Sequence, residues 1–214
     1  MEKYIIWDWN GTLLDDVDAA VAALNRMLKE RGLPLTDRTF YRAHFGFPVR
    51  PFYVDLGMDP DREWERICID FHAFIHDAPQ AIRPDTQAAL QFVQDHGARQ
   101  SILSALRQDL LRRDTAAAGV VPFFEHIFGV DNLNGATKLS RGHDLMAELR
   151  ASGGNRECFF IGDTLHDAEV GQALGATPIL VDGGHQTSER LQSAGCAVVP
   201  SLLDAVQLAL RPKG

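Results

Sequence analysis

The sequence predicts an α/β protein in which a doubly wound parallel sheet carries a small, all-helical insert. Beyond about residue 80 of the 214-residue chain, helical patterns of roughly 10 to 12 residues alternate with short apolar strands, as in parallel sheets covered by helices on both faces. Residues 15–80 contain helical patterns and no strand pattern. These two observations predict a core formed by residues 1–14 and 81–214, and a helical cap formed by residues 15–80.

The first strand is predicted just before Asp8, where tyrosine, two isoleucines and a tryptophan form an apolar run. Asn10 and Gly11 then turn the chain sharply. A buried strand of this kind delivers Asp8 to the carboxyl edge of the sheet, where ligands bind in open α/β folds. Asp8 is therefore a candidate nucleophile or metal ligand. Asn-Gly is also a common tight turn, so this stretch alone leaves a purely structural role open.

The insert is predicted from apolar residues at helical spacing, such as Val17, Val21 and those that follow them up to Gly32. Asp15, Asp16 and Asp18 are expected in the first turn of this helix, where acidic side chains favour the helix dipole. The junctions of the insert, near residues 14 and 80, lie close to the edge of the sheet that carries Asp8. An insert hinged there can open and close over that edge.

The composition excludes several classes of function. The formal net charge of −8 opposes binding to nucleic acid or to an anionic membrane. No apolar run approaches the 18 or so residues that span a bilayer, and the N-terminal run is too short for a signal peptide. The three cysteines are far apart, which favours reduced thiols. We expect a cytoplasmic protein that is a monomer or a homodimer.

Polar residues also follow other predicted strands of the core. Ser104 follows a strand ending at Leu103, and Asp163 and Asp167 follow a strand ending at Ile161, whereas Lys138 lies in the loop before a core helix. Each alone can be a helix cap or a surface residue. Together they can converge on one point at the sheet edge. We expect the Asp8 strand in the middle of the sheet, between the strands that lead to Ser104 and to Asp163.

The order of these motifs resembles the haloacid dehalogenase superfamily of phosphotransferases, and within it the phosphoglycolate-phosphatase-like group with a helical cap. The segment DWNGTLLDD is similar to the first motif of that superfamily, Ser104 to the second, Lys138 to the third and GDTLHD to the fourth. The resemblance implies a Rossmann-like core and a Mg²⁺-dependent phosphatase. It would hydrolyse a small phosphorylated metabolite, such as phosphoglycolate, through an aspartyl-phosphate on Asp8.

The residue types suit phosphoryl transfer, which requires an in-line nucleophile and neutralisation of the phosphoryl oxygens. Mg²⁺ prefers carboxylates and carbonyl oxygens, so its expected ligands are Asp8, Asp163 and the main-chain oxygen of Asn10. Asp167 would either bind the metal or orient one of its waters. The residues expected to hold the phosphoryl oxygens are Gly11, Thr12, Ser104 and Lys138.

The cap segment YRAHFGFPVR is expected to select the leaving group of the substrate. Its Gly46-Phe47-Pro48 turn is similar to the substrate-specificity loop of the family. The candidate selecting residues are Arg42, His44, Gly46 and Arg50.

One position departs from the family pattern. Phosphatases of the group that this chain resembles carry a second aspartate, two residues after the nucleophile, which acts as a proton carrier. This chain has Asn10 at that position. An amide cannot give up or accept a proton near neutral pH, and losing a positioned acid or base commonly costs about 100- to 10,000-fold in rate.

Asn10 leaves several functions open. The enzyme could be slow, could act on good leaving groups, or could borrow His166 or His44 as a proton carrier. It could instead cleave phosphonates, which would require a cap lysine, and the insert contains only Lys29. A protein that binds phosphometabolites without catalysis is the alternative from a different class.

Overall fold

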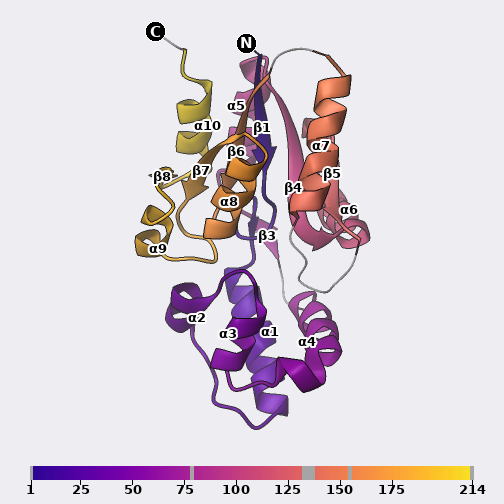
Figure 1. The fold of residues 1–214 in the computed structure, drawn as a ribbon, viewed down its shortest axis with the longest axis vertical. Helices are drawn as coiled ribbons and strands as arrows, with labels where there is room; N and C mark the ends of the chain where they lie inside the picture. Colours follow the sequence, from indigo (N-terminus) through magenta and orange to yellow (C-terminus); the bar gives the residue numbers. More distant parts are fainter. Residues whose placement is uncertain (1, 78–79, 132–137, 154–155, 213–214) are drawn as a thin grey trace.

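The computed structural model describes residues 2–77, 80–131, 138–153 and 156–212, and its core is built on a six-stranded parallel sheet (Figure 1). The strands lie in the order β5, β4, β1, β6, β7, β8. Their bounds are β1 Glu2–Trp7, β4 Arg99–Arg107, β5 Ile127–Val130, β6 Arg156–Gly162, β7 Thr177–Val181 and β8 Ala197–Val199. The central strand β1 pairs in parallel with β4 and β6. The predicted fold class, with the Asp8 strand in the middle of the sheet, is therefore confirmed.

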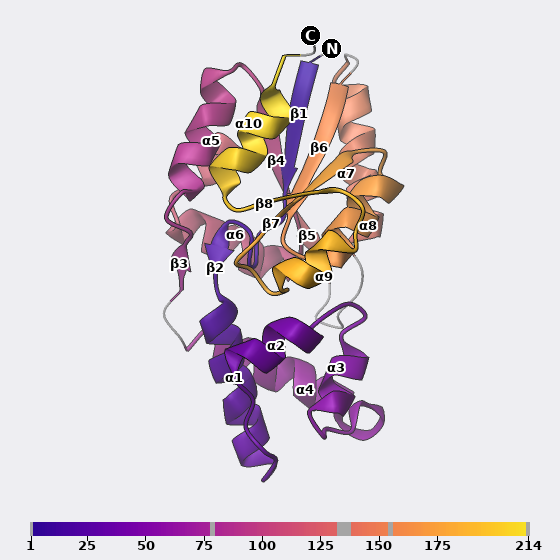
Figure 2. The same cartoon turned by 90° about the vertical axis from the view of Figure 1, so that its left-hand side faces the viewer.

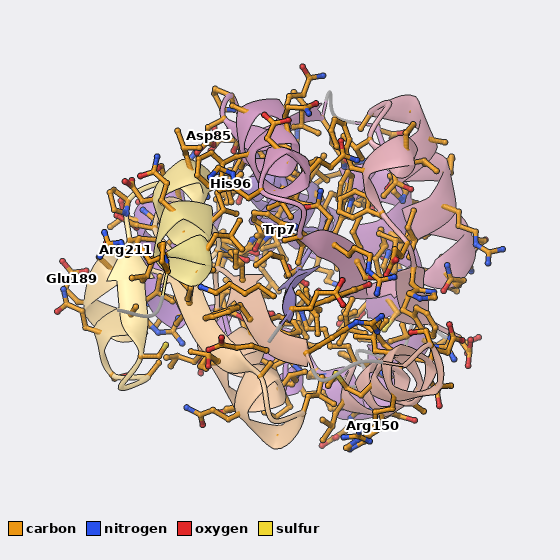
Figure 3. All side chains as sticks on the ribbon, turned by 90° about the horizontal axis from the view of Figure 1, so that it is seen from above. Trp7, Asp85, His96, Arg150, Glu189 and Arg211 are labelled. Carbon is orange, nitrogen blue, oxygen red and sulfur yellow. The ribbon has the colours of Figure 1, made fainter. Side chains whose placement is uncertain are left out.

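Helices cover both faces of this sheet (Figures 1 and 2). One face packs against α5 (Thr86–Asp95), α6 (Gln108–Ala117) and α10 (Leu202–Leu210), and the other against α7 (Leu139–Ala151) and α8 (Leu165–Ala173). Side chains of β1 alternate between the two faces, Ile5 and Trp7 on the first and Tyr4 and Ile6 on the second. Trp7 lies near the middle of the molecule when it is seen from above (Figure 3). Burial on both faces explains why this strand is apolar throughout.

Two short helices were not anticipated from the sequence. They are the 3₁₀ helix Val121–Phe123, and α9 (Ser188–Gln192), which begins soon after β7. Both are shorter than the windows over which helical periodicity is recognised. None of the helices among the described residues combines the length and the apolar character that crossing a membrane requires.

The insert folds as four helices with a hydrophobic cluster of their own. They are α1 (Val17–Glu30), α2 (Arg38–His44), α3 (Arg50–Asp55) and α4 (Pro60–Ile75). The cluster includes Leu24, Leu28 and Ile67, which are almost completely buried. Asp37 begins α2 by accepting a hydrogen bond from the Phe40 N–H at 2.7 Å. The insert lies beyond one end of the sheet, next to the carboxyl ends of its strands (Figure 2).

A small antiparallel pair joins the insert to the core. Strand β2 (Leu14–Asp15) pairs with β3 (Ala81–Ile82), so both junctions of the insert are held side by side. The prediction that Asp15 belongs to the first helical turn was wrong, because its main chain is extended in this pair. The boundaries of the two domains themselves remain a prediction.

We predict that the hydrophobic cluster of the insert contributes measurably to stability. Leu28→Ala should lower the free energy of unfolding by about 2–5 kcal/mol, because it removes a fully buried side chain and leaves a cavity. Val54→Ala on α3 is the matched control: its side chain is 56% exposed, and the change should be within about 0.5 kcal/mol. Urea unfolding followed by circular dichroism measures both. Equal effects of the two substitutions would contradict this account of the insert.

Candidate active site

Asp8 lies at the floor of a cavity between the sheet and the cap. Its main-chain N–H donates to the Ile161 carbonyl oxygen at 2.9 Å, so the pairing of β1 with β6 continues beyond Trp7. Asp8 is 7% exposed, and it lines the cavity. The structure thus brings this carboxylate to the sheet edge at which ligands of α/β proteins bind.

Lys138 connects Asp8 to Asp167. It lies immediately before α7 and is 2% exposed, and its Nζ donates to Asp167 Oδ1 at 2.5 Å and also to an Asp8 carboxylate oxygen. Burial alone would lower the pKa of Lys138, but the two adjacent carboxylates raise it, so the side chain stays charged. Residues 132–137, which include the loop predicted to lead into Lys138, lie outside the described residues.

Three carboxylates form a cluster that can hold a cation. Oxygen atoms of Asp8, Asp163 and Asp167 all lie within 4.8 Å of one another. Burial is the main cause that raises the pKa of Asp8 and of Asp163, and a divalent cation between them would favour their ionised forms. An all-oxygen donor set of this kind suits Mg²⁺. The residues present therefore fit the metal that the sequence predicts.

Asp167 is held in place by the start of α8. Its Oδ2 accepts hydrogen bonds from the Asp163 N–H at 3.1 Å, the Thr164 N–H at 2.9 Å and the Thr164 hydroxyl at 2.7 Å. Thr164 Oγ1 in turn accepts from the Asp167 N–H, which completes a capping box. Asp167 therefore has one orientation, with Oδ1 directed at Lys138.

Gly11 and Thr12 contact the side chain of Asp163. The Thr12 hydroxyl donates to Asp163 Oδ1 at 2.8 Å. Gly11 has φ of 73°, and a Cβ there would lie 2.3 Å from Asp163 Oδ2. Both the left-handed main chain and the close approach therefore require glycine at this turn.

Ser104 also lies in the cavity, although the strand does not end before it as predicted. Strand β4 continues to Arg107, with an irregularity in its pairing between Leu103 and Arg107. Such an irregularity bends the strand and redirects its side chains. Ser104 Oγ is buried and accepts from the Leu106 N–H at 3.1 Å, which leaves the hydroxyl hydrogen to donate into the cavity.

Sequence reasoning missed a second set of buried polar residues, centred on Asp16. The Asn10 amide Nδ2 donates to Asp16 Oδ2 at 2.7 Å, and the Gly11 N–H donates to Asp16 Oδ1 at 2.8 Å. His185 Nε2 lies 3.2 Å from Asp16 Oδ1. The other ring nitrogen of His185 is 2.8 Å from the Tyr41 hydroxyl, which belongs to the cap. A continuous chain of hydrogen bonds therefore joins the cap to the turn after the strand that carries Asp8.

The electrostatics of this second set favour an ion pair. Burial alone would lower the pKa of His185, but the carboxylate of Asp16, with those of Asp163 and Asp8, raises it to about 9. Burial alone would raise the pKa of Asp16, but the His185 charge and the hydrogen bonds from Asn10 and Gly11 lower it. At neutral pH both groups are therefore charged.

A signal for His185 was present in the sequence. Its loop, residues 182–186, follows β7 at the same sheet edge as Asp8 and Asp163, and it carries polar residues. The rule used to find Asp163 applies equally to this loop. Asp16, in contrast, has the sequence context of an ordinary acidic residue at the start of a helix, although its side chain makes no capping hydrogen bond.

The cavity has a volume of about 170 Å³ and two kinds of surface. The surface that the core contributes is mostly polar and includes Asp8, Asn10, Ser104, Lys138, Asp167 and His185, with Ala105 and Leu106 as its apolar members. The surface that the cap contributes is largely apolar and aromatic. A bound ligand would therefore meet polar groups of the core on one side and apolar side chains of the cap on the other.

Arg42, predicted to select the substrate, anchors the cap to the core, and its role in selection stays a prediction. Its guanidinium donates to the carbonyl oxygens of Gly184 and Gln186, both at 2.8 Å, and pairs with Asp182 at 3.0 Å. All three partners belong to the loop after β7. Arg42 is not among the described residues that line the cavity.

The other three cap candidates also lie away from the cavity lining. His44 is exposed and stacks on Phe40 with ring centroids 4.0 Å apart. The Arg50 guanidinium lies 4.6 Å from the centroid of the Trp64 ring and is half-exposed. Gly46 is not in the lining either. A contribution of these residues to substrate selection would have to act through the residues that they hold.

The candidate proton carrier His166 and the cap lysine Lys29 differ in position. His166 lines the cavity and stacks on Phe47 of the cap with ring centroids 4.7 Å apart. Lys29 is exposed on the last turn of α1, and the lining does not include it.

Known proteins resemble this chain over almost its whole length. A family model described as haloacid dehalogenase-like hydrolase matches residues 5–181. The "Probable phosphatase IndB" of Dickeya dadantii is 23% identical over 93% of this chain and 89% of its own length, and a phosphoglycolate phosphatase of Caulobacter vibrioides is 28% identical over 94% and 87%. A haloacid dehalogenase-like family protein of Streptococcus pneumoniae has the same fold, with a TM-score of 0.82 at 16% identity, covering 97% of this chain and 98% of that one.

We predict that the carboxylate cluster binds Mg²⁺. Titration calorimetry should detect one site, and Asp163→Asn should weaken binding at least about tenfold, because one ionised ligand is replaced by an amide. Asp95→Asn, at the exposed end of α5, removes the same charge far from the cluster and should bind Mg²⁺ like the parent protein. Unchanged affinity in Asp163→Asn would contradict the assignment of the cluster.

Proposed function

The chain belongs to the haloacid dehalogenase-like hydrolase family, and on that premise we propose that it is a Mg²⁺-dependent phosphatase acting on a small phosphomonoester. The observation that carries this proposal is the buried carboxylate cluster of Asp8, Asp163 and Asp167 beside Lys138, of which Asp8, Asp167 and Lys138 line the polar end of the cavity. Relatives named as phosphatases support the same class of reaction.

Asp8 is assigned as the nucleophile. An Asp8 carboxylate oxygen would attack phosphorus while the bond from phosphorus to the leaving oxygen breaks, which gives an aspartyl-phosphate. Water would then attack phosphorus and release inorganic phosphate and the Asp8 carboxylate. Dividing one difficult hydrolysis into two steps in this way requires mainly positioning and neutralisation of charge.

We assign the metal and Lys138 to neutralising the negative charges of Asp8 and of the phosphoryl group. Asp8, Asp163 and the main-chain oxygen of Asn10 would hold Mg²⁺, which when bound would reduce the repulsion between Asp8 and the phosphate. Lys138 and the Ser104 hydroxyl would donate to phosphoryl oxygens. Asp167 already accepts three hydrogen bonds on Oδ2 and contacts Lys138 with Oδ1, so we assign it to orienting Lys138.

Protonation of the leaving oxygen is the step for which this site is least equipped. The Asn10 amide is engaged with Asp16 and cannot transfer a proton. Of the two histidines considered, His166 lines the cavity and His44 does not. A slow enzyme, or one whose substrate has a good leaving group, agrees with this arrangement. Phosphonate cleavage is less consistent with it, because Lys29 lies away from the cavity.

Phosphate release with and without Mg²⁺ tests the proposed function. A panel of phosphomonoesters that includes acetyl phosphate, whose leaving group requires little protonation, should give Mg²⁺-dependent turnover that EDTA abolishes. Asp8→Asn should give no measurable turnover, because it removes both the nucleophile and a metal ligand. A folded protein that binds Mg²⁺ and releases phosphate from none of these compounds would support the non-catalytic alternative.

We predict that positions 10 and 16 act as a pair. Asn10→Asp should supply a proton carrier, but it also places a second carboxylate within hydrogen-bonding distance of Asp16, which raises the pKa of one of them. The exchange Asn10→Asp/Asp16→Asn keeps one amide facing one carboxylate. We expect the double variant to exceed the parent turnover by about 100-fold, and Asn10→Asp alone to gain less.

Steady-state kinetics of the two single variants and the double variant measure this coupling as a double-mutant cycle. Asp16→Asn alone is the control and should not raise turnover, because it adds no proton carrier. Asn10 precedes Gly11, and Asn-Gly sequences deamidate readily, so peptide mass spectrometry must accompany each assay. Additive effects of the two substitutions would show that the Asn10–Asp16 contact is without consequence.

A further inference from the structure

The cap gives the cavity an apolar wall opposite the charged residues. This wall includes side chains from the α2–α3 loop and from α4, namely Phe45, Phe47, Val49, Trp64, Phe71 and Ile75. Aromatic side chains provide large apolar area and stack on planar groups. A substrate whose phosphate reaches Asp8 would place its leaving group against these residues.

The cations near this wall have carboxylate partners of their own. Arg50, which lies over Trp64, is 3.5 Å from Asp61, and Arg113, which contacts His76, pairs with Asp114 at 2.9 Å. Arg31 pairs with Glu63 at 2.9 Å and with Asp70 at 3.1 Å inside the cap, and Arg42 is bound to the loop after β7. Among the described residues that line the cavity, Lys138 is the one lysine or arginine, and Asp8 and Asp167 engage it. The His185 imidazolium also lines the cavity, and Asp16 engages it at 3.2 Å. A leaving group with a carboxylate, such as that of phosphoglycolate, would therefore lose its hydration without gaining a cation that is not already paired with a carboxylate.

The ionisable groups in the wall do not change this conclusion. Burial is the main cause that lowers the pKa of His72 to about 4, and burial also lowers the pKa of His76, so neither is charged at neutral pH. Asp114 adds a carboxylate at the same end of the cavity and pairs with Arg113 at 2.9 Å. At this end of the cavity an anionic leaving group would meet neutral imidazoles and a carboxylate.

From these contacts, together with Asn10, we infer that the substrate is an aryl phosphomonoester, an inference that rests on the proposed function. The aromatic ring would lie against the apolar wall of the cap while the phosphate meets Asp8 and Lys138. A phenol is acidic, with a pKa of about 10 as in tyrosine, so its oxygen departs as phenolate with little need of a proton donor. The apolar wall and the amide at position 10 thus favour the same class of substrate.

Kinetics on a matched series test this inference. In phenyl, 4-methylphenyl, 4-ethylphenyl and 4-propylphenyl phosphate the acidity of the phenol stays nearly constant while apolar area grows. Each added carbon should raise kcat/KM about two- to fourfold until the cavity is filled. Phenyl phosphate should exceed 2-phosphoglycolate by at least about tenfold. A flat series together with better turnover of 2-phosphoglycolate would overturn the inference.

Acetyl phosphate separates this inference from the proposed function, because it offers almost no apolar surface to the wall. Turnover of acetyl phosphate with no preference for aryl compounds would leave the phosphatase assignment standing and refute the aryl substrate. If no compound is turned over, the proposed function fails. Calorimetry in the presence of Mg²⁺ can then still compare the binding of aryl and carboxylate-bearing phosphonates. Phenylphosphonate should then bind at least about tenfold tighter than phosphonoacetate; equal or reversed affinities would refute the inference.

Two lysine substitutions on α4 provide a matched pair. Phe71 is half-buried and lines the cavity, whereas Ile69 is 54% exposed and does not. F71K should lower kcat/KM for phenyl phosphate about tenfold or more and raise it for 2-phosphoglycolate, because a cation then faces the leaving group. I69K should change both less than about twofold. Circular dichroism checks that both variants are folded, and equal behaviour of the two would contradict the role of the wall.

Discussion

The site depends on one buried ammonium group that two carboxylates share. Lys138 is enclosed between Asp8 and Asp167, and charges removed from water to this extent persist only with close partners. The partners come from separate elements: Asp8 from the end of β1, Asp167 from the start of α8, and Lys138 from the residue before α7. The parallel sheet makes this meeting possible, because it brings the carboxyl ends of its strands, and the helices that follow them, to a single edge.

The cap is connected to that edge by specific contacts as well as by its two junctions. Tyr41 contacts His185, and His185 contacts Asp16, which receives the amide of Asn10. Arg42 binds the same loop that carries His185. The position of the cap and the conformation of the turn after Asp8 are therefore coupled through hydrogen bonds. A cap that moved away would break the Tyr41 contact and expose the Asp16–His185 ion pair to water, where it is worth much less.

Local sequence patterns predict the sheet and most of the charged residues of the site. An apolar run that leads into Asp, Ser or Gly-Asp indicates a buried strand, and the residue that follows the run is the polar side chain at the carboxyl end of that strand. The same patterns could not reveal Asp16, since an aspartate before a helix is expected for helix stability alone. Nor could they reveal that Arg42 anchors the cap to the loop after β7, because sequence does not tell which partner a polar side chain reaches. The same patterns could not identify the aromatic wall either. Trp64 and Phe71 have the spacing of residues that pack in an ordinary helix core, and this spacing does not distinguish them from residues that line a cavity.

The charges of the site explain why an amide suits position 10. Four buried carboxylates, those of Asp8, Asp16, Asp163 and Asp167, face the Lys138 ammonium, the His185 imidazolium and a place for one divalent cation. These charges cancel. A fifth carboxylate at position 10 would leave an excess negative charge in a buried site before a phosphate dianion arrives, and would repel Asp16 across a distance of a hydrogen bond. Asp16 and Asn10 thus form one unit: the Asp16 carboxylate holds the turn in place, and its charge makes an aspartate at position 10 unfavourable. For the phosphatase proposed above, this arrangement favours transfer to Asp8 from a leaving group that needs no proton from the protein.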